Sequence, residues 1–355
     1  MINNIASNFL HALRGRSANV FRSQAICRNL SSCVKIILLS DANMRTAAVL
    51  SLLAAADLIA ASPLQWLWLS NKRQVESQMN DVDILRYALT LEHLEDKFYR
   101  EGLANFTKAD FRAAGYDNSF YKNVKAISAH ETAHVEFLTA GLEAAGVKPV
   151  AECKYAFGID SVDAFVATAS VLEGVGTSAY LGAAKQISNK AYLTAAGSIL
   201  TVEARHSAYL RANLPQSPFA QSQDNPLTPD EVHTMASGFI VSCPKGNPTF
   251  PIKAFPGLTV TTTGKIRAGD QITLVTNRYV LAAGAKGAKL HAVFVTANGP
   301  VHAQMKAKKD GMTFTVTIPE RVHGQSYLLL SNCDEAATSV PDETVVAGPT
   351  YLEIK

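Results

Sequence analysis

Two Glu-x-x-His motifs are the residues of this sequence best suited to metal chemistry. They are Glu131-Thr-Ala-His134 and Glu203-Ala-Arg-His206. Residues three apart lie on one face of an α-helix, so the Glu and the His of each motif can reach a common point. A single motif of this kind is as compatible with a solvated helix face as with a binding site. The phase of the motifs against the surrounding apolar residues distinguishes the two interpretations.

Each motif interrupts an apolar stripe that should face a protein core. Ile127 and Leu138 flank the first motif, and Ile199 and Leu210 flank the second. Two further acids interrupt apolar stripes in the same way: Glu92, within LTLEHLEDKFY, and Glu173, within SVLEGVGTSAY. Buried carboxylates are costly without compensating charge. We therefore predict two divalent cations for the four carboxylates, and carboxylate plus imidazole ligation suits Fe or Mn better than Ca or Mg.

The stretch that carries these side chains has the composition and apolar spacing that are typical of helices. Ala, Leu, Glu and Lys dominate it, and apolar positions recur at spacings of three and four. We predict four long helices, at about 80–101, 120–145, 161–187 and 190–212. A polar stretch after the first contains a short helix of its own, and Gly146 with Pro149 ends the second.

After the four helices, the amino-acid composition of the chain changes twice. Residues 214–228 form a Pro/Ser/Gln/Asn-rich linker, and a fifth helix at about 229–241 opens with Thr228 as its cap and Pro229 as its first residue. From residue 244 onward, β-branched runs separated by Gly, Asn, Pro and Asp predict about seven strands, with a hairpin turn at Asp310-Gly311. This pattern indicates a small antiparallel β-sandwich.

The order of the acidic motifs is Glu, Glu-x-x-His, Glu, Glu-x-x-His, which is the order of ferritin-like di-iron and di-manganese proteins. The chain resembles that superfamily over about residues 77–213. LRYALTLEHLEDKFY, followed by AHETAHVEFL, is similar to the ferritin-like domain of fungal Rds1-type stress-response proteins and plant desiccation-related proteins. SCPKGNPTFPIKAFPGLTV also resembles the fungal members, so the resemblance covers most of the chain after residue 76.

The resemblance implies a role for each of six residues. Glu131 and Glu203 would bridge two metal ions. Glu92 and Glu173 would be terminal carboxylates, and His134 and His206 would be terminal imidazoles. The predicted fold class is α+β and multidomain. Its parts are a targeting or extension segment (1–73), a ferritin-like antiparallel four-helix bundle (74–213), a linker with a fifth helix (214–243) and the β-sandwich (244–355).

Five residues near the motifs need separate interpretations. Glu95, one turn beyond Glu92, is expected to support a ligand or to lie at a solvated rim rather than to bind metal. His93 and His130 lie off the ligand phase and are expected at the surface or in hydrogen bonds between helices. Tyr180 is expected as a packed core tyrosine, with a hydrogen bond to a carboxylate or control of electron flow as alternatives. Arg205 is expected to pair with an acid outside the core.

The five cysteines include no CxxC pair, which makes a structural zinc site a poor expectation. Three of them, Cys153, Cys243 and Cys333, follow the targeting segment. A Cys153–Cys243 bond is the first choice and Cys243–Cys333 the second, since sequence alone leaves connectivity open.

The N-terminal segment differs in charge from the rest. Residues 1–73 contain eight basic and two acidic residues, a net +6, which leaves 25 basic and 28 acidic residues and a net −3 for the remainder. Residues 44–62 read as a secretory signal, with Met44 as the favoured start and Lys72-Arg73 as a dibasic processing site. Residues 1–40, rich in Arg and Ser and free of acids, support the mitochondrial alternative. Asp57 and Pro63 make a permanent membrane span a poor fit.

Two classes of function follow. In the first, this is a secreted stress- or desiccation-response protein whose dinuclear site oxidises metal or consumes O₂ or H₂O₂. In the second, it is a structural or protective cell-surface or extracellular protein without catalysis, so enzymatic activity stays open. The β domain is expected to contact proteins or the cell wall. A nucleic-acid partner is not expected, because a solvated hairpin rim accounts for Lys306, Lys308 and Lys309.

Overall fold

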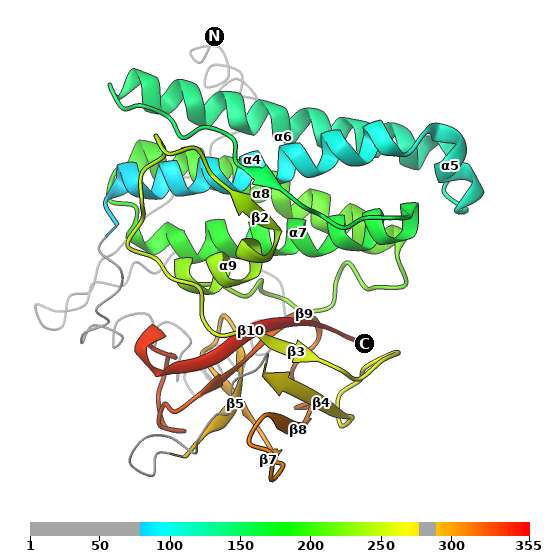
Figure 1. The fold of residues 1–355 in the computed structure, drawn as a ribbon, viewed down its shortest axis with the longest axis vertical. Coiled ribbons are helices and arrows are strands. Elements are labelled where there is room, and N and C mark those ends of the chain that lie inside the picture. Colours follow the sequence, from blue (N-terminus) through cyan, green and yellow to red (C-terminus); the bar gives the residue numbers. More distant parts are fainter. Residues whose placement is uncertain (1–78, 277–288) are drawn as a thin grey trace, which may run out of the picture. The chain divides into compact units, whose positions relative to one another are not determined.

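The computed structural model describes residues 79–276 and 289–355. The predicted targeting segment, its signal sequence and its dibasic pair lie outside the described residues. Within them, helices come first along the chain and antiparallel sheets follow, which confirms the predicted fold class (Figure 1).

Four long helices and one short helix make up the N-terminal part. They are α4 (Asp81–Asn105), α5 (Lys108–Ala113), α6 (Asn118–Ala144), α7 (Val162–Ala183) and α8 (Lys190–Asn213). The four long ones lie within a few residues of the predicted ranges, and the 3₁₀ turn η2 (Ala184–Gln186) follows α7. Side-chain caps set their starts, because the first turn of a helix has free N–H groups. Asn80, for example, accepts from the Asp83 amide at 3.0 Å in a capping box.

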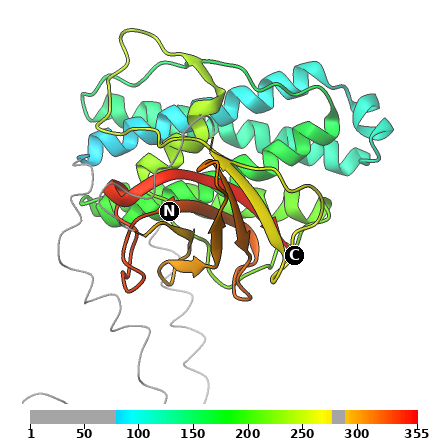
Figure 2. The same cartoon turned by 60° about the horizontal axis from the view of Figure 1, so that its bottom comes forward.

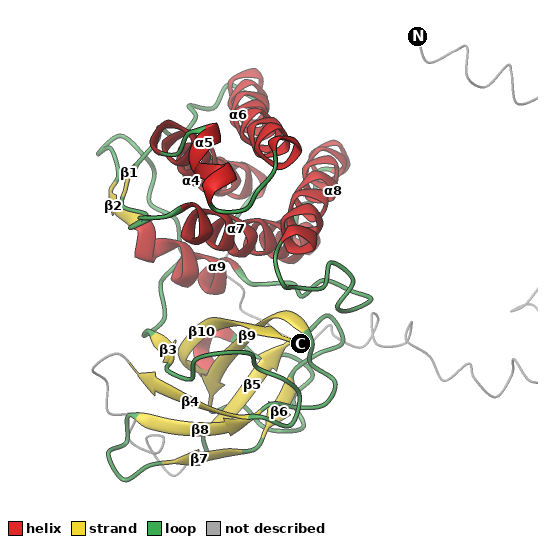
Figure 3. Cartoon of the chain, turned by 90° about the vertical axis from the view of Figure 1, so that its right-hand side faces the viewer, coloured by secondary structure: helices red, strands yellow, loops and turns green. Residues whose placement is uncertain are grey.

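The long helices pack as two pairs, α4 with α6 and α7 with α8 (Figure 3). α7 is the most enclosed of them. Gly102 of α4 leaves room for the Phe165 ring, which a Cβ on Gly102 would approach to 2.1 Å. Gly182 similarly accommodates the carbonyl oxygen of Leu227, at 1.8 Å from where a Cβ would lie.

One described segment, Val162–Gln186, has the length and composition of a helix that could cross a membrane. Of its most apolar 18-residue window, 56% is buried inside the protein. Packing in a core explains such an apolar composition, so this helix is weak evidence for a membrane span.

The fifth helix, α9 (Pro229–Ala236), is shorter than predicted. Its start is as expected, with Thr228 and Glu231 in a capping box and Pro229 in the first turn. Its predicted end at residue 241 is wrong. A 3₁₀ turn, η3 (Ser237–Phe239), follows α9, and strand β2 (Ile240–Ser242) then pairs with β1 (Lys154–Tyr155). This pairing with a distant segment takes the backbone out of the helix.

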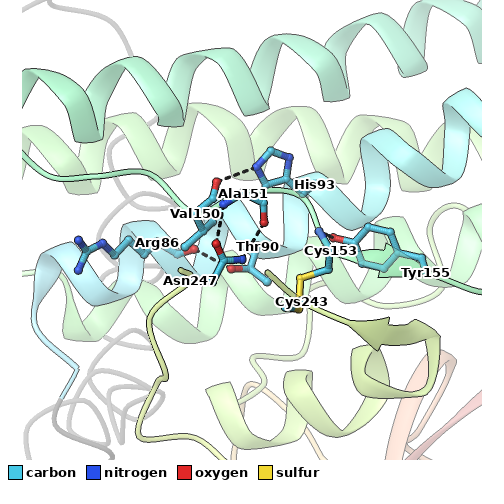
Figure 4. Close-up of a disulfide and its surroundings, with 9 residues drawn as sticks. All are labelled: Arg86, Thr90, His93, Val150, Ala151, Cys153, Tyr155, Cys243 and Asn247. Atoms are coloured by element: carbon cyan, nitrogen blue, oxygen red, sulfur yellow. Dashed lines mark hydrogen bonds between the residues drawn. A yellow bond between two sulfur atoms is a disulfide. The ribbon is translucent and has the colours of Figure 1, made fainter. Parts of the chain in front are cut away.

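A disulfide between Cys153 and Cys243 joins the same two segments, as the first-choice pairing predicts (Figure 4). Cys333 is a buried free thiol, so the alternative bond with Cys243 is wrong. Next to the disulfide, Asn247 and Ala151 exchange two hydrogen bonds, of 2.8 and 2.7 Å. The connection between α6 and α7 is therefore held to the segment after α9.

The C-terminal part consists of two four-stranded antiparallel sheets that share one apolar core (Figure 2). One sheet has the order β10-β9-β5-β6 and the other the order β3-β4-β8-β7. The strands are β3 (Leu258–Val260), β4 (Gln271–Thr276), β5 (His291–Val295), β6 (Val301–Ala303), β7 (Met305–Ala307), β8 (Thr313–Thr317), β9 (Gly324–Ser331) and β10 (Val345–Ile354). The predicted runs all contain strands, and the turn at Asp310-Gly311 joins β7 to β8. The three-residue strands β6 and β7 lie outside the predicted runs.

Strand β9 makes direct contacts with α7. The Tyr327 hydroxyl donates to the carbonyl oxygen of Gly174 at 2.9 Å, and Gln325 Nε2 donates to that of Val171 at 3.1 Å. Gly174 permits this approach, since a Cβ there would lie 2.4 Å from the Gln325 side chain. The sheet thus supports α7 at the residue that follows Glu173.

The close approach at Gly182 predicts a difference between two helical glycines. Gly182→Ala should lower the free energy of unfolding by at least about 1–3 kcal/mol, because the methyl group would overlap a backbone carbonyl. Gly197→Ala in α8 is the matched control. Nothing lies within 4 Å of its Cβ position, so helix propensity should raise stability by up to about 1 kcal/mol. Urea unfolding of both variants measures this, and equal effects would contradict the packing described.

Candidate metal centre

All six predicted ligand side chains meet in the middle of the helical bundle. Their donor atoms form two groups of four, each within 4.8 Å: Glu92, Glu131, His134 and Glu203 in one, and Glu131, Glu173, Glu203 and His206 in the other. The four glutamates are fully buried, and the histidines are 8% and 5% exposed. Glu131 and Glu203 belong to both groups, so their carboxylates lie between the other four residues.

The spacing around His134 is that of a metal coordination shell. Its Nδ1 lies 3.2 Å from one carboxylate oxygen each of Glu92, Glu131 and Glu203. A single N–H cannot donate well to three acceptors. Metal–nitrogen and metal–oxygen bonds of about 2.0–2.2 Å would place ligand atoms at right angles about 3.0 Å apart. The observed distances therefore suit atoms arranged around a common cation.

His206 occupies the equivalent place in the second group. Its Nδ1 lies 3.0 Å from Glu131 Oε1 and 3.2 Å from Glu173 Oε2. Its other nitrogen, Nε2, lies 2.9 Å from Nδ1 of His130, and the two rings are stacked. The prediction that His130 makes a hydrogen bond between helices is confirmed. His93 bonds to the Val150 carbonyl oxygen at 3.1 Å, away from the cluster (Figure 4).

Three buried carboxylate oxygens have no hydrogen bond from any described residue: Glu131 Oε1 and both oxygens of Glu203. An imidazole nitrogen approaches two of them, but without the geometry of a hydrogen bond. Buried polar atoms are normally satisfied, and the exceptions need an explanation. Orphaned oxygens on the two central carboxylates fit bound metal ions as their missing partners.

Burial and mutual repulsion shift the ionisation of the cluster. Burial, with the charges of Glu131 and Glu173, raises the pKa of Glu203 well above its usual range. Burial raises the pKa of Glu92 to about 7. Burial lowers the pKa of His134, but hydrogen bonds to the surrounding carboxylates outweigh this effect and raise that pKa to about 12. Without cations, the cluster must therefore hold protons to compensate its charge.

Two tyrosines bind the two outer carboxylates. The Tyr99 hydroxyl donates to Glu173 Oε1 and the Tyr180 hydroxyl donates to Glu92 Oε1, each at 2.5 Å. Each tyrosine lies seven residues after the acid of its own helix and bonds to the acid of the other helix. Tyr180 therefore follows the alternative of a bond to a carboxylate rather than a purely packed role. Tyr99 was missed, although the repeated Glu-x₆-Tyr spacing in two helices was a usable signal.

The structure narrows one expectation about neighbouring residues and contradicts another. Glu95 is only 5% exposed, which excludes the solvated rim and leaves the alternative that it supports a ligand. Arg205 has no ion pair within residues 79–276 and 289–355, and its side chain instead lines a groove. Neither position could be fixed from periodicity alone, because each depends on how far apart neighbouring helices lie.

The groove lies between α6 and α8 and has a volume of about 410 Å³. His134 and His206 form part of its wall, together with His130, Arg205 and Tyr209. The groove connects the outer side of the imidazole ligands with solvent. A small molecule can therefore approach the cluster from this side.

Comparison with known proteins agrees with this geometry. Residues 80–216 match the family model described as ferritin-like domain. The chain is 26% identical over 178 residues to Protein rds1 of Schizosaccharomyces pombe (strain 972 / ATCC 24843), which covers 50% of this chain and 44% of that protein. This chain thus matches less than half the length of that relative.

Among solved structures, the Lin-41 filamin domain matches 29% of this chain and 98% of its own at 16% identity. Its TM-score is 0.19, too low to support a conclusion about the fold. The helical bundle, the buried Glu/His cluster and the matching family model agree with one another. Residues 80–216 are thus similar to a ferritin-like domain, and they form a helical bundle around a buried Glu/His cluster.

Proposed function

We propose that this protein is a secreted, stress-related ferritin-like protein whose bundle binds two iron or manganese ions and reacts with O₂ or H₂O₂. One observation carries the proposal: two groups of four buried donor atoms share Glu131 and Glu203. In this assignment these two carboxylates would be shared by the two metal ions. Glu92 with His134 would complete one site, and Glu173 with His206 would complete the other.

The donor set supports iron or manganese. Four carboxylates and two imidazoles combine oxygen and nitrogen ligands, whereas calcium and magnesium are bound almost entirely through oxygen. Two divalent ions carry four positive charges, which balance the four glutamates. When bound, such a pair supplies two-electron redox chemistry toward O₂ or peroxide.

Access to the cluster favours a reactive site over a purely structural one. Structural metal sites are closed by protein ligands, whereas catalytic sites keep a position open. The groove between α6 and α8 reaches both histidines. A metal held only for stability would need no such opening. The alternative is a protective extracellular protein whose bundle has no catalytic activity.

Secretion is supported by two features of the described residues. The Cys153–Cys243 disulfide is typical of oxidising compartments. Asn105, in the sequon Asn105-Phe106-Thr107, is exposed at the last residue of α4, where a glycan would meet no obstruction from the helix core.

The first prediction concerns metal content. The full-length protein, purified after growth with iron and manganese, should contain about two ions per chain. Glu131→Gln/Glu203→Gln should lose them, because both shared carboxylates become neutral. Glu136→Gln, which neutralises an exposed acid on the same helix, is the control and should retain both ions. Elemental analysis decides, and a metal-free wild type would overturn the dinuclear site.

The second prediction concerns reactivity. The metal-loaded protein should consume O₂ or H₂O₂, measured with an oxygen electrode and by peroxide absorbance. Ala126 lines the groove, so Ala126→Trp should slow this reaction severalfold while leaving the metal content unchanged. Ala129→Trp, an exposed substitution on α6 outside the groove, should react at the wild-type rate. A fully loaded wild type that consumes neither oxidant would favour the non-catalytic alternative.

The third prediction concerns location. The native protein should begin after residue 62 or after Arg73, and glycosidase treatment should increase its gel mobility. Asn105→Gln should remove that mobility change without altering the N-terminus. N-terminal sequencing with the glycosidase assay tests both points. An unglycosylated chain that begins within residues 20–43 would instead support mitochondrial import.

A further inference from the structure

The two halves of the helical bundle repeat the same pattern around the cluster. In α4 and α7, an outer glutamate is followed seven residues later by the tyrosine that bonds across the bundle. In α6 and α8, each helix carries one Glu-x-x-His motif. The repeat fails at one inward position: Glu95, three residues after Glu92, corresponds to Gly176, three residues after Glu173.

The glycine on α7 makes room for the glutamate on α4. A Cβ on Gly176 would lie 3.0 Å from Glu95 Oε1 and 2.8 Å from Glu203 Oε2. The carboxylates of Glu95 and Glu203 therefore share the space that a side chain on α7 would fill. Glu95 points from α4 across the bundle, toward the shared carboxylate rather than toward solvent.

Glu95 has no ordinary partner in this position. Within residues 79–276 and 289–355, no group donates a hydrogen bond to its carboxylate and no basic side chain pairs with it. Its electrostatic neighbours are the four glutamates of the cluster, with Glu203 the strongest. Its other side faces a small apolar pocket lined by Val175, Met235 and Phe239.

The adjacent residue, Asp96, is a buried carboxylate on the same helix whose oxygens do have hydrogen-bond donors. It is also 5% exposed, but it accepts hydrogen bonds from Arg100 at 2.8 Å and from Thr132 at 2.7 Å. A structural carboxylate in this bundle thus has donors. Glu95 has only other carboxylates, which is unfavourable for an ionised group unless cations lie between them.

We propose that Glu95 is a seventh ligand of the metal centre, which makes the two metal sites inequivalent. This inference rests on the proposed dinuclear function. A fifth carboxylate exceeds the charge of two divalent ions and suits a more oxidised pair better. Glu95 therefore favours binding of one ion over the other and stabilises the pair after oxidation.

The test uses Co²⁺ as a spectroscopic probe in the full-length protein. Wild type should bind two Co²⁺ ions. Glu95→Gln, which keeps the shape but removes the charge, should bind one of them at least tenfold more weakly. The d–d absorption of one cobalt only should change in intensity, because its coordination changes. Glu136→Gln is the matched control and should leave both binding and spectrum unaltered.

Apo-protein stability separates loss of a ligand from loss of structure. Gln has the shape of a protonated, neutral Glu, so the Tm of the apo Glu95→Gln protein should stay close to that of apo wild type, whereas the Tm increase on adding Co²⁺ should shrink. Gly176→Ala is a second variant, expected to weaken Co²⁺ binding because its methyl group intrudes between the two carboxylates.

Two outcomes would overturn the proposal, and they differ from each other. If Glu95→Gln binds two Co²⁺ ions with wild-type affinity and an unaltered spectrum, Glu95 is not a ligand although the dinuclear site stands. If wild type binds no Co²⁺, iron or manganese, the dinuclear site itself is wrong and the role of Glu95 falls with it.

Discussion

The burial of several carboxylates at one point in the core is the constraint on which the rest of this structure depends. Four glutamates of the cluster are fully buried, and Glu95 lies beside them. Among the described residues, the partners of the four are two imidazoles and two tyrosine hydroxyls, which leave three of the four oxygens of Glu131 and Glu203 without a hydrogen bond. Protons can relieve the repulsion in the apo state, but cations do so without leaving orphaned acceptors.

Much of the architecture holds the helix that carries one of these acids. α7 packs against α8, and α9 and β9 also contact it. The hydrogen bond from Tyr327 reaches the carbonyl group immediately after Glu173, and Arg211 of α8 forms a bidentate pair with Glu353 of β10 at 2.8 and 2.9 Å. The β-sandwich is thus attached to the same two helices that bear Glu173, Glu203 and His206.

Helical phase was sufficient to predict which acids meet, because burial of an apolar stripe leaves a helix little rotational freedom. It was insufficient wherever the outcome depended on a distant segment. The end of α9 depends on the pairing of β2 with β1, which lies some 90 residues earlier. The role of Glu95 depends on an opposing glycine, Gly176, in another helix. Tyr99 lies seven residues after Glu92, but only the crossing of α4 with α7 shows that it binds Glu173.

The two sides of the cluster differ in a way that follows from the same packing. Between α6 and α8 the helices leave a groove that reaches both imidazoles, lined also by His130 and Arg205. On the opposite side, between α4 and α7, α9 covers the cluster with apolar side chains and Glu95 is enclosed. The open side therefore presents imidazoles and a guanidinium group, whereas the additional carboxylate lies on the far side of the cluster. In the proposed function, this arrangement would attract anions to the open side and would stabilise bound cations from the closed one.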